Sequence, residues 1–145
     1  MNMPLLNFGT ILGFAAELEA ADQEFYRNAA KNPACAQHQE LFETFARDEK
    51  KNEQTLLRSR REHVTEMILE QIPDFPRAPF LSDRTDALTM NMEETLAKSI
   101  DIEEKAESFY LQAAEKITAL REVSLLFERL AKRRTAHKEQ LASLK

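Results

Sequence analysis

Apolar residues recur at three- and four-residue intervals in four segments of the chain, a spacing that places them on one face of an α-helix. The four predicted helices cover about residues 8–31, 34–70, 91–118 and 122–144. Pro33 separates the first two, because a proline disfavours helical geometry in the residue before it. Asn91 and Glu94 form an N-cap pair at the start of the third. The pattern therefore predicts an all-α protein.

The connections between these helices differ in length. A short turn joins the first helix to the second, and another joins the third to the fourth, so each pair is expected to form an antiparallel hairpin. The two hairpins are joined by a proline-rich linker over about residues 71–90, which could reach about 60 Å at ~3.3 Å per residue. Two hairpins with one long crossover connection are typical of a ferritin-like four-helix bundle. We expect residues 1–145 to form one such domain.

The first and third predicted helices carry the same polar pattern. A glutamate precedes a tyrosine by seven residues in each: Glu19 precedes Tyr26, and Glu103 precedes Tyr110. Seven residues are about two helical turns, so each glutamate shares a face with its tyrosine. A carboxylate on the inner face of a helix is costly unless a cation lies beside it. A metal site between the helices is therefore the leading hypothesis.

The second and fourth predicted helices are related to each other as well. Both contain Leu-Phe-Glu-x-x-Ala, and alignment on this motif places Arg134 opposite Glu49 and His137 opposite Asn52. An ancestral Glu-x-x-His motif would explain both copies, since residues three apart project from one face of a helix. Carboxylate and imidazole ligands suit iron or manganese.

Together these motifs resemble those of the rubrerythrin-like branch of the ferritin-like superfamily, over about residues 8–70 and 92–144. Members of that family bind a di-iron centre and act on peroxide, oxygen or ferrous iron. The resemblance implies a homodimer and metal ligands at Glu19, Glu49, Glu103 and His137. It also implies an external redox partner for any catalysis, because the chain lacks the cysteines needed for the separate rubredoxin-type iron centre of full rubrerythrins.

Two positions depart from the family pattern. Asn52 replaces a histidine, and Arg134 replaces a bridging glutamate. Asparagine is a poor ligand for iron, and the permanently charged arginine cannot ligate a metal. The other half of the site keeps Glu49, Glu103 and His137. The expectation is therefore a single metal ion there, iron or another divalent ion such as manganese or zinc, with Arg134 in place of the second metal.

A metal-free alternative stays open at this point. Arg134 would then bridge Glu19, Glu49 and Glu103 in a buried ion network that fixes the geometry without a metal. The chain would act as an interaction or scaffold protein rather than as a metal-dependent oxidoreductase. Asp22, one turn after Glu19, would either join that network or face solvent.

Tyr26 and Tyr110 have two compatible roles. As buried phenols they would donate hydrogen bonds to carboxylates, and beside a redox metal they would bind a ligand carboxylate or quench a radical.

Composition excludes some classes of function. The net charge of −5 argues against general nucleic-acid binding through phosphates. The single cysteine, Cys35, cannot form a disulfide within the chain or a cysteine knuckle for a metal. The apolar stretch near the N-terminus is short and interrupted, so neither a signal peptide nor a membrane span is expected, and a cytoplasmic location is predicted.

Overall fold

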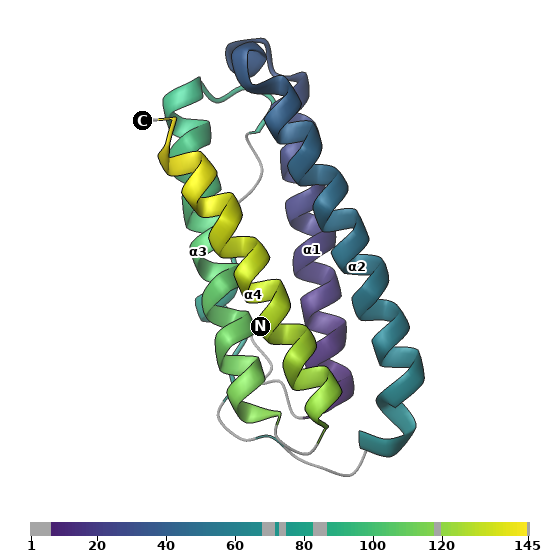
Figure 1. The fold of residues 1–145 in the computed structure, drawn as a ribbon. Helices are drawn as coiled ribbons and strands as arrows, with labels where there is room; N and C mark the ends of the chain where they lie inside the picture. Colours follow the sequence, from purple (N-terminus) through teal and green to yellow (C-terminus); the bar gives the residue numbers. More distant parts are fainter. Residues whose placement is uncertain (1–6, 68–71, 73–74, 83–86, 118–119, 145) are drawn as a thin grey trace.

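The computed structural model describes residues 7–67, 72, 75–82, 87–117 and 120–144, which contain four α-helices and no β-strand (Figure 1). The helices are α1 (Phe8–Lys31), α2 (Gln39–Met67), α3 (Met92–Lys116) and α4 (Arg121–Ala142), with two short 3₁₀ helices, η1 (Pro33–His38) and η2 (Ala78–Phe80). The four long helices form a bundle. The apolar periodicity of the sequence therefore predicted the all-α class and the four-helix bundle correctly.

The second helix begins later than its apolar pattern predicts. We expected it from about residue 34, but residues 33–38 form η1, and α2 begins at Gln39. The side chain of Asn32 accepts a hydrogen bond from the backbone N–H of Ala34 at 2.9 Å, and Cys35 departs from helical geometry with φ −108° and ψ 16°. The local cap therefore starts a short 3₁₀ segment before the α-helix can form.

The other helix ends lie close to their predicted positions. The N-cap pair of α3 is confirmed, because the Asn91 side chain accepts from the Glu94 N–H at 2.8 Å while the Glu94 side chain accepts from the Asn91 N–H at 3.2 Å. The predicted ends at residues 70 and 118 lie outside the described residues. Helix α4 runs from one residue before its predicted start to two residues before its predicted end.

The helices pack in two close pairs, α1 with α2 and α3 with α4. In Figure 1, η1 connects α1 and α2 at one end of the bundle, and α3 and α4 approach each other at the opposite end. The last turn of α2 and the first turn of α3 also lie at opposite ends. Within the described residues, no helix is both long and apolar enough to cross a membrane.

Two apolar clusters form the core, and a layer of buried polar side chains lies between them. In α1 the first cluster takes Ile11 to Leu18, and the second takes Phe25 to Ala30. The buried Glu19 and Asp22 fall between these stretches. The polar layer therefore crosses the middle of the bundle and is closed by apolar side chains on both sides.

Phe109 on α3 is the centre of the first cluster. Its ring contacts four other phenylalanine rings at centroid distances of 5.3, 5.4, 5.3 and 6.3 Å, those of Phe14, Phe75, Phe80 and Phe127. Its side chain is fully buried. The packing of several elements therefore depends on this one ring.

Replacing Phe109 with alanine should lower the free energy of unfolding by about 3–5 kcal/mol, because the substitution leaves a cavity among the surrounding rings. Urea denaturation followed by circular dichroism measures this loss. Leu111→Ala is the matched control on the same helix: Leu111 is 51% exposed, so its loss should stay within about 0.5 kcal/mol. Equal losses for the two variants would contradict the described core.

Candidate metal centre

All nine residues singled out from the sequence are buried in the polar layer. Each helix contributes at least two of them from its inner face. They are Glu19, Asp22 and Tyr26 on α1, Glu49 and Asn52 on α2, Glu103 and Tyr110 on α3, and Arg134 and His137 on α4. The sequence pattern therefore identified the face of every helix that points into this layer.

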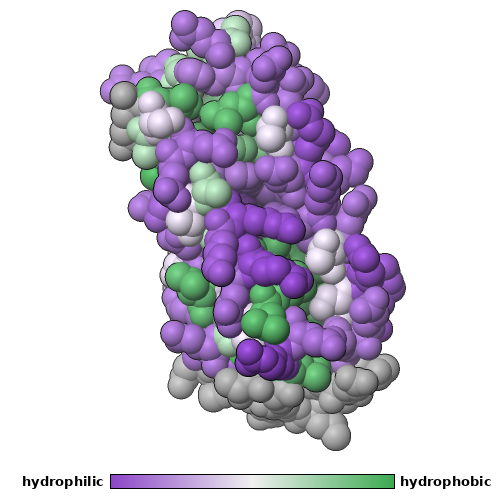
Figure 2. Space-filling view, viewed as in Figure 1, coloured by the Kyte–Doolittle hydropathy of each residue, from purple (hydrophilic) through white to green (hydrophobic). Residues whose placement is uncertain are grey.

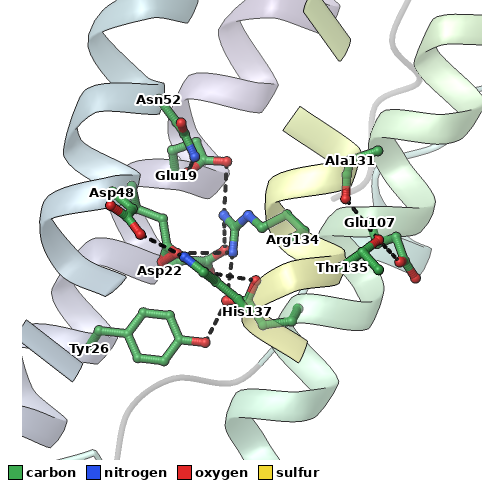
Figure 3. Close-up of polar contacts among 12 residues, drawn as sticks. Glu19, Asp22, Tyr26, Asp48, Asn52, Glu107, Ala131, Arg134, Thr135 and His137 are labelled. Carbon is green, nitrogen blue, oxygen red and sulfur yellow. Dashed lines mark hydrogen bonds and ion pairs between the residues drawn. The ribbon is translucent and has the colours of Figure 1, made fainter. Parts of the chain in front are cut away.

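The guanidinium of Arg134 lies at the centre of the layer and contacts four carboxylates (Figure 3). Its Nη2 is 2.9 Å from Glu19 Oε2 and 2.8 Å from Asp22 Oδ2. Its Nη1 is 2.9 Å from Glu103 Oε2 and 3.3 Å from Glu49 Oε2. The structure thus contains the arginine–carboxylate network that the sequence suggested as an alternative to a metal site. Asp22 belongs to this network and does not face solvent.

The carboxylates outnumber the guanidinium. Burial lowers the pKa of Arg134, but the four carboxylates raise it well above its usual value, so Arg134 stays charged. Burial raises the pKa of Glu49 well above its usual value despite the opposing effect of Arg134. Burial also raises the pKa of Glu103, but Arg134 and His137 outweigh it and lower the pKa overall. The two glutamates of the layer nearest His137 are therefore shifted in opposite directions, with protonation favoured at Glu49 and disfavoured at Glu103.

The two tyrosines bind the glutamates of each other's helices. The hydroxyl of Tyr26 on α1 donates to Glu103 Oε2 at 2.6 Å, and the hydroxyl of Tyr110 on α3 donates to Glu19 Oε2. Burial and the neighbouring carboxylates raise the pKa of both phenols well above the usual value, so both remain hydrogen-bond donors. The repeated Glu–Tyr motif therefore forms a reciprocal pair of bonds between α1 and α3.

His137 connects the buried layer to the protein surface. Its Nδ1 is 3.5 Å from Glu49 Oε2 and 3.4 Å from Glu103 Oε1, while its Nε2 is 2.9 Å from Asp48 Oδ2. Its ring stacks on Phe45 with centroids 3.8 Å apart. Burial lowers the pKa of His137, but its contacts with Glu103 and Glu49 outweigh burial and raise the pKa to about 10.

Asp48 is a site residue that the sequence pattern did not single out. Its side chain is 42% exposed, so it falls outside the apolar line of α2. A ligating histidine usually donates its other ring N–H to a carboxylate. That rule, applied to the acidic residue next to Glu49, is the signal that could have found it.

Four buried polar atoms around His137 have no hydrogen-bond partner among the described residues, namely both Glu49 carboxylate oxygens, Glu103 Oε1 and His137 Nδ1. His137 Nδ1 lies 3.4–3.5 Å from the two glutamates, and Arg134 Nη1 lies 3.3 Å from Glu49 Oε2; none of these contacts has hydrogen-bond geometry. Each buried polar atom without a partner costs about 1–3 kcal/mol. One ligand atom from each of the three residues lies within 4.8 Å of the others. Two carboxylates and one imidazole that converge in this way fit a divalent metal ion.

Glu19 lies outside this group of three. Its Oε1 accepts a hydrogen bond from Asn52 Nδ2 at 3.2 Å, and its Oε2 contacts Arg134 and Tyr110. Asn52 Oδ1 in turn accepts a hydrogen bond at 2.6 Å from Nη1 of Arg133 on α4. Of the four ligands that the resemblance implied, the structure brings three together and binds the fourth to other side chains.

The layer is reached from the side between α2 and α4. A cavity of about 570 Å³ lies there, and Asn52 and His137 are among its lining residues. Of the nine residues above, these two line the cavity. Solvent or a small molecule would therefore meet the site at His137.

No family model, curated protein or solved structure matches the chain. What the site can do is therefore argued from its own geometry.

Arg134→Met should lower the free energy of unfolding of the metal-free protein by about 3–5 kcal/mol at neutral pH, because four carboxylates lose their shared cation. The loss should shrink as pH falls, since the carboxylates can then take up protons. Urea denaturation at several pH values measures both effects. Arg129→Met, at an exposed position of the same helix, should have little effect. An Arg134→Met loss that does not change with pH would contradict the network.

The metal-free protein should lose stability as pH rises from 6.5 to 10, because the pKa of His137 is about 10 in the folded state against 6.5 ordinarily. A raised folded pKa gives stability that is complete below the unfolded value and disappears as pH passes the folded value. Urea denaturation across this range, with His137→Gln, should show a flatter profile for the variant. His38→Gln, a change at a histidine in η1, should keep the wild-type slope.

Proposed function

We propose that this protein is a rubrerythrin-like member of the ferritin-like superfamily that binds one divalent metal ion through Glu49, Glu103 and His137. The observation that carries the proposal is the convergence of four unpartnered polar atoms from these three side chains in the buried layer. A bound cation would give all three groups a partner and would offset the excess of negative charge around Arg134.

The path of the chain supports the ferritin-like part of the proposal. In Figure 1 the sequence colours ascend along α1 and α4 and descend along α2 and α3, which corresponds to two antiparallel hairpins. The connection from α2 to α3 has to span the length of the bundle, since these two helix ends lie at opposite ends. Both features are typical of a bundle with one crossover connection.

Arg134 supports a single metal rather than two. In the aligned repeat it replaces the bridging glutamate of the second half-site, and its guanidinium contacts Glu19 and Asp22 at hydrogen-bond distance. A second cation would meet a fixed positive charge there and would lack ligands. The aligned motifs and the contacts agree on this point.

The neighbouring side chains are arranged to present the three ligands. Asp48 binds Nε2 of His137 and leaves Nδ1 directed at the two glutamates. Tyr26 and Arg134 both bind Glu103 Oε2 and leave Oε1 without a partner. These contacts fix the orientation of both ligands before a metal binds.

The donor set suits iron, manganese or zinc. With iron, the bound ion would supply redox chemistry of the rubrerythrin type, either oxidation of ferrous iron or reduction of peroxide to water. Peroxide reduction takes two electrons and two protons, and the electrons would come from an external redox protein. A homodimer and a cytoplasmic location are part of the same proposal.

The second candidate is a metal-free bundle used for association or as a scaffold. One observation favours it: Arg134 already contacts four carboxylates, and a protonated Glu49 with a protonated His137 would remove much of the remaining charge. Protons and metal would then compete for the same atoms, because ligands bind a metal in their deprotonated form. Metal content decides between the two candidates.

Purified protein loaded with ferrous iron or manganese should hold one metal ion per chain by elemental analysis, and His137→Ala should abolish retention. Asp48→Asn should weaken metal affinity by about 10–100-fold, because it removes the group that orients His137. His38→Ala, a change at a histidine outside the site, should retain the metal. Absence of metal in the wild-type protein would favour the scaffold candidate.

The double variant Asn52→His with Arg134→Glu restores the two replaced family ligands and should raise the content to two metal ions per chain. A content that stays at one would contradict the idea that these two positions once supplied the second half-site.

A further inference from the structure

A cavity of about 570 Å³ lies between α2 and α4, on the solvent side of the buried polar layer. Three cations line it, Lys51 and Arg58 from α2 and Arg133 from α4. We propose that this cavity binds a small multivalent anion that carries phosphate or several carboxylates. This site goes beyond the metal centre and does not depend on it.

The charge of the cavity is the first argument. All three cationic side chains are exposed. None of them forms an ion pair within the part of the chain that the structure describes. The cavity has one acidic lining residue, Asp48, and its carboxylate is already bound to His137 at 2.9 Å. A protein with a net charge of −5 thus gathers three uncompensated positive charges around one hollow. Such a concave cluster attracts anions from solution.

The arrangement of Arg133 is the second argument. Its Nη1 donates to Asn52 Oδ1 at 2.6 Å, which anchors one edge of the guanidinium at the floor of the cavity. An arginine held in this way keeps further N–H groups in a planar fork, the geometry that oxyanions accept in pairs. Neutral polar side chains also line the cavity, those of Gln54, Thr55 and Gln140.

The size of the cavity limits the occupant. A volume of about 570 Å³ falls within the ~300–1,000 Å³ typical of small-molecule sites. Phosphate or a tricarboxylate fits such a volume, whereas the overall negative charge opposes a nucleic-acid polymer. Figure 2 shows strongly hydrophilic side chains over the middle of the face that contains α4. The occupant is therefore a small, highly charged anion rather than an apolar molecule.

A second basic recess on the far side of α2 provides an internal comparison. It lies between α1 and α2, and its lining includes two cations from each helix: Arg27 and Lys31 from α1, and Arg47 and Lys50 from α2. It differs from the first cavity in that its lining includes neither Asn52 nor His137, the two residues of the polar layer that line the first, and it includes the carboxylate of Glu43. In addition, Arg47 binds the neighbouring Thr44 hydroxyl at 3.1 Å. Variants there test whether surface charge alone would bind the anion.

The test is isothermal titration calorimetry of the metal-free 145-residue chain with inorganic phosphate and, separately, with citrate, at low ionic strength. Saturable binding of either anion at one site per chain is expected, and the comparison of the two tells phosphate chemistry from carboxylate chemistry. Arg133→Gln should weaken that binding by at least about tenfold, through loss of charge-assisted hydrogen bonds. The triple variant Lys51→Gln, Arg58→Gln, Arg133→Gln should abolish it.

Arg47→Gln removes the same charge from the comparison recess and should leave affinity within about twofold of the wild-type value. All four substituted positions are exposed, so each variant is expected to keep the wild-type fold. Thermal unfolding of each variant checks this. The proposal is overturned if neither anion gives saturable heat. It is also overturned if Arg47→Gln weakens binding as much as Arg133→Gln, because diffuse surface charge would then explain the effect.

Discussion

The contact of one buried guanidinium with four carboxylates is the constraint on which the rest of this structure depends. Arg134 on α4 contacts Glu19 and Asp22 on α1, Glu49 on α2 and Glu103 on α3, all within 3.3 Å. Buried ion pairs gain little net stability, because desolvation offsets most of the attraction. Their larger effect here is on geometry: a shift of any helix along the bundle would separate its carboxylate from a group that the other helices share. The apolar clusters on either side can then pack in one register.

The same contacts leave the polar layer with an excess of negative charge, which determines whether protons or a metal ion bind there. One guanidinium cannot neutralise four carboxylates, so the layer needs further positive charge from protons or from a metal. Glu49 and His137 would take up protons, and the same two residues together with Glu103 would bind a metal ion. Burial raises the pKa of Glu49, and the glutamates raise the pKa of His137 to about 10 despite burial, so protons occupy the site readily. The proposed metal ion and the scaffold alternative are therefore two occupancies of one set of atoms, with the balance set by pH and metal supply.

Helical periodicity could predict which residues face inward but not which of them touch. Glu19 and Tyr26 share a face of α1, yet Tyr26 binds Glu103 and Tyr110 binds Glu19, because the contact depends on how α1 packs against α3. Asp48 and Arg133 escaped prediction for another reason. Both lie outside the apolar lines of their helices and reach the site from its solvent side. The start of α2 differed because a local cap at Asn32 outweighed the apolar pattern.

Asn52 and Arg134, the two weakest candidates for metal ligands in the layer, converge on the same carboxylate. Asn52 binds Glu19 Oε1, and Arg134 binds Glu19 Oε2, so Glu19 is satisfied by side chains alone. Without these two contacts Glu19 would keep only the hydrogen bond from Tyr110, and its Oε1 would be a buried atom without a partner, at a cost of about 1–3 kcal/mol. Among the described residues, the carboxylate and imidazole atoms of the layer that lack partners belong instead to Glu49, Glu103 and His137. This asymmetry is what the proposed single-metal site requires, because the carboxylate and imidazole atoms without partners belong to the three residues that would hold the ion.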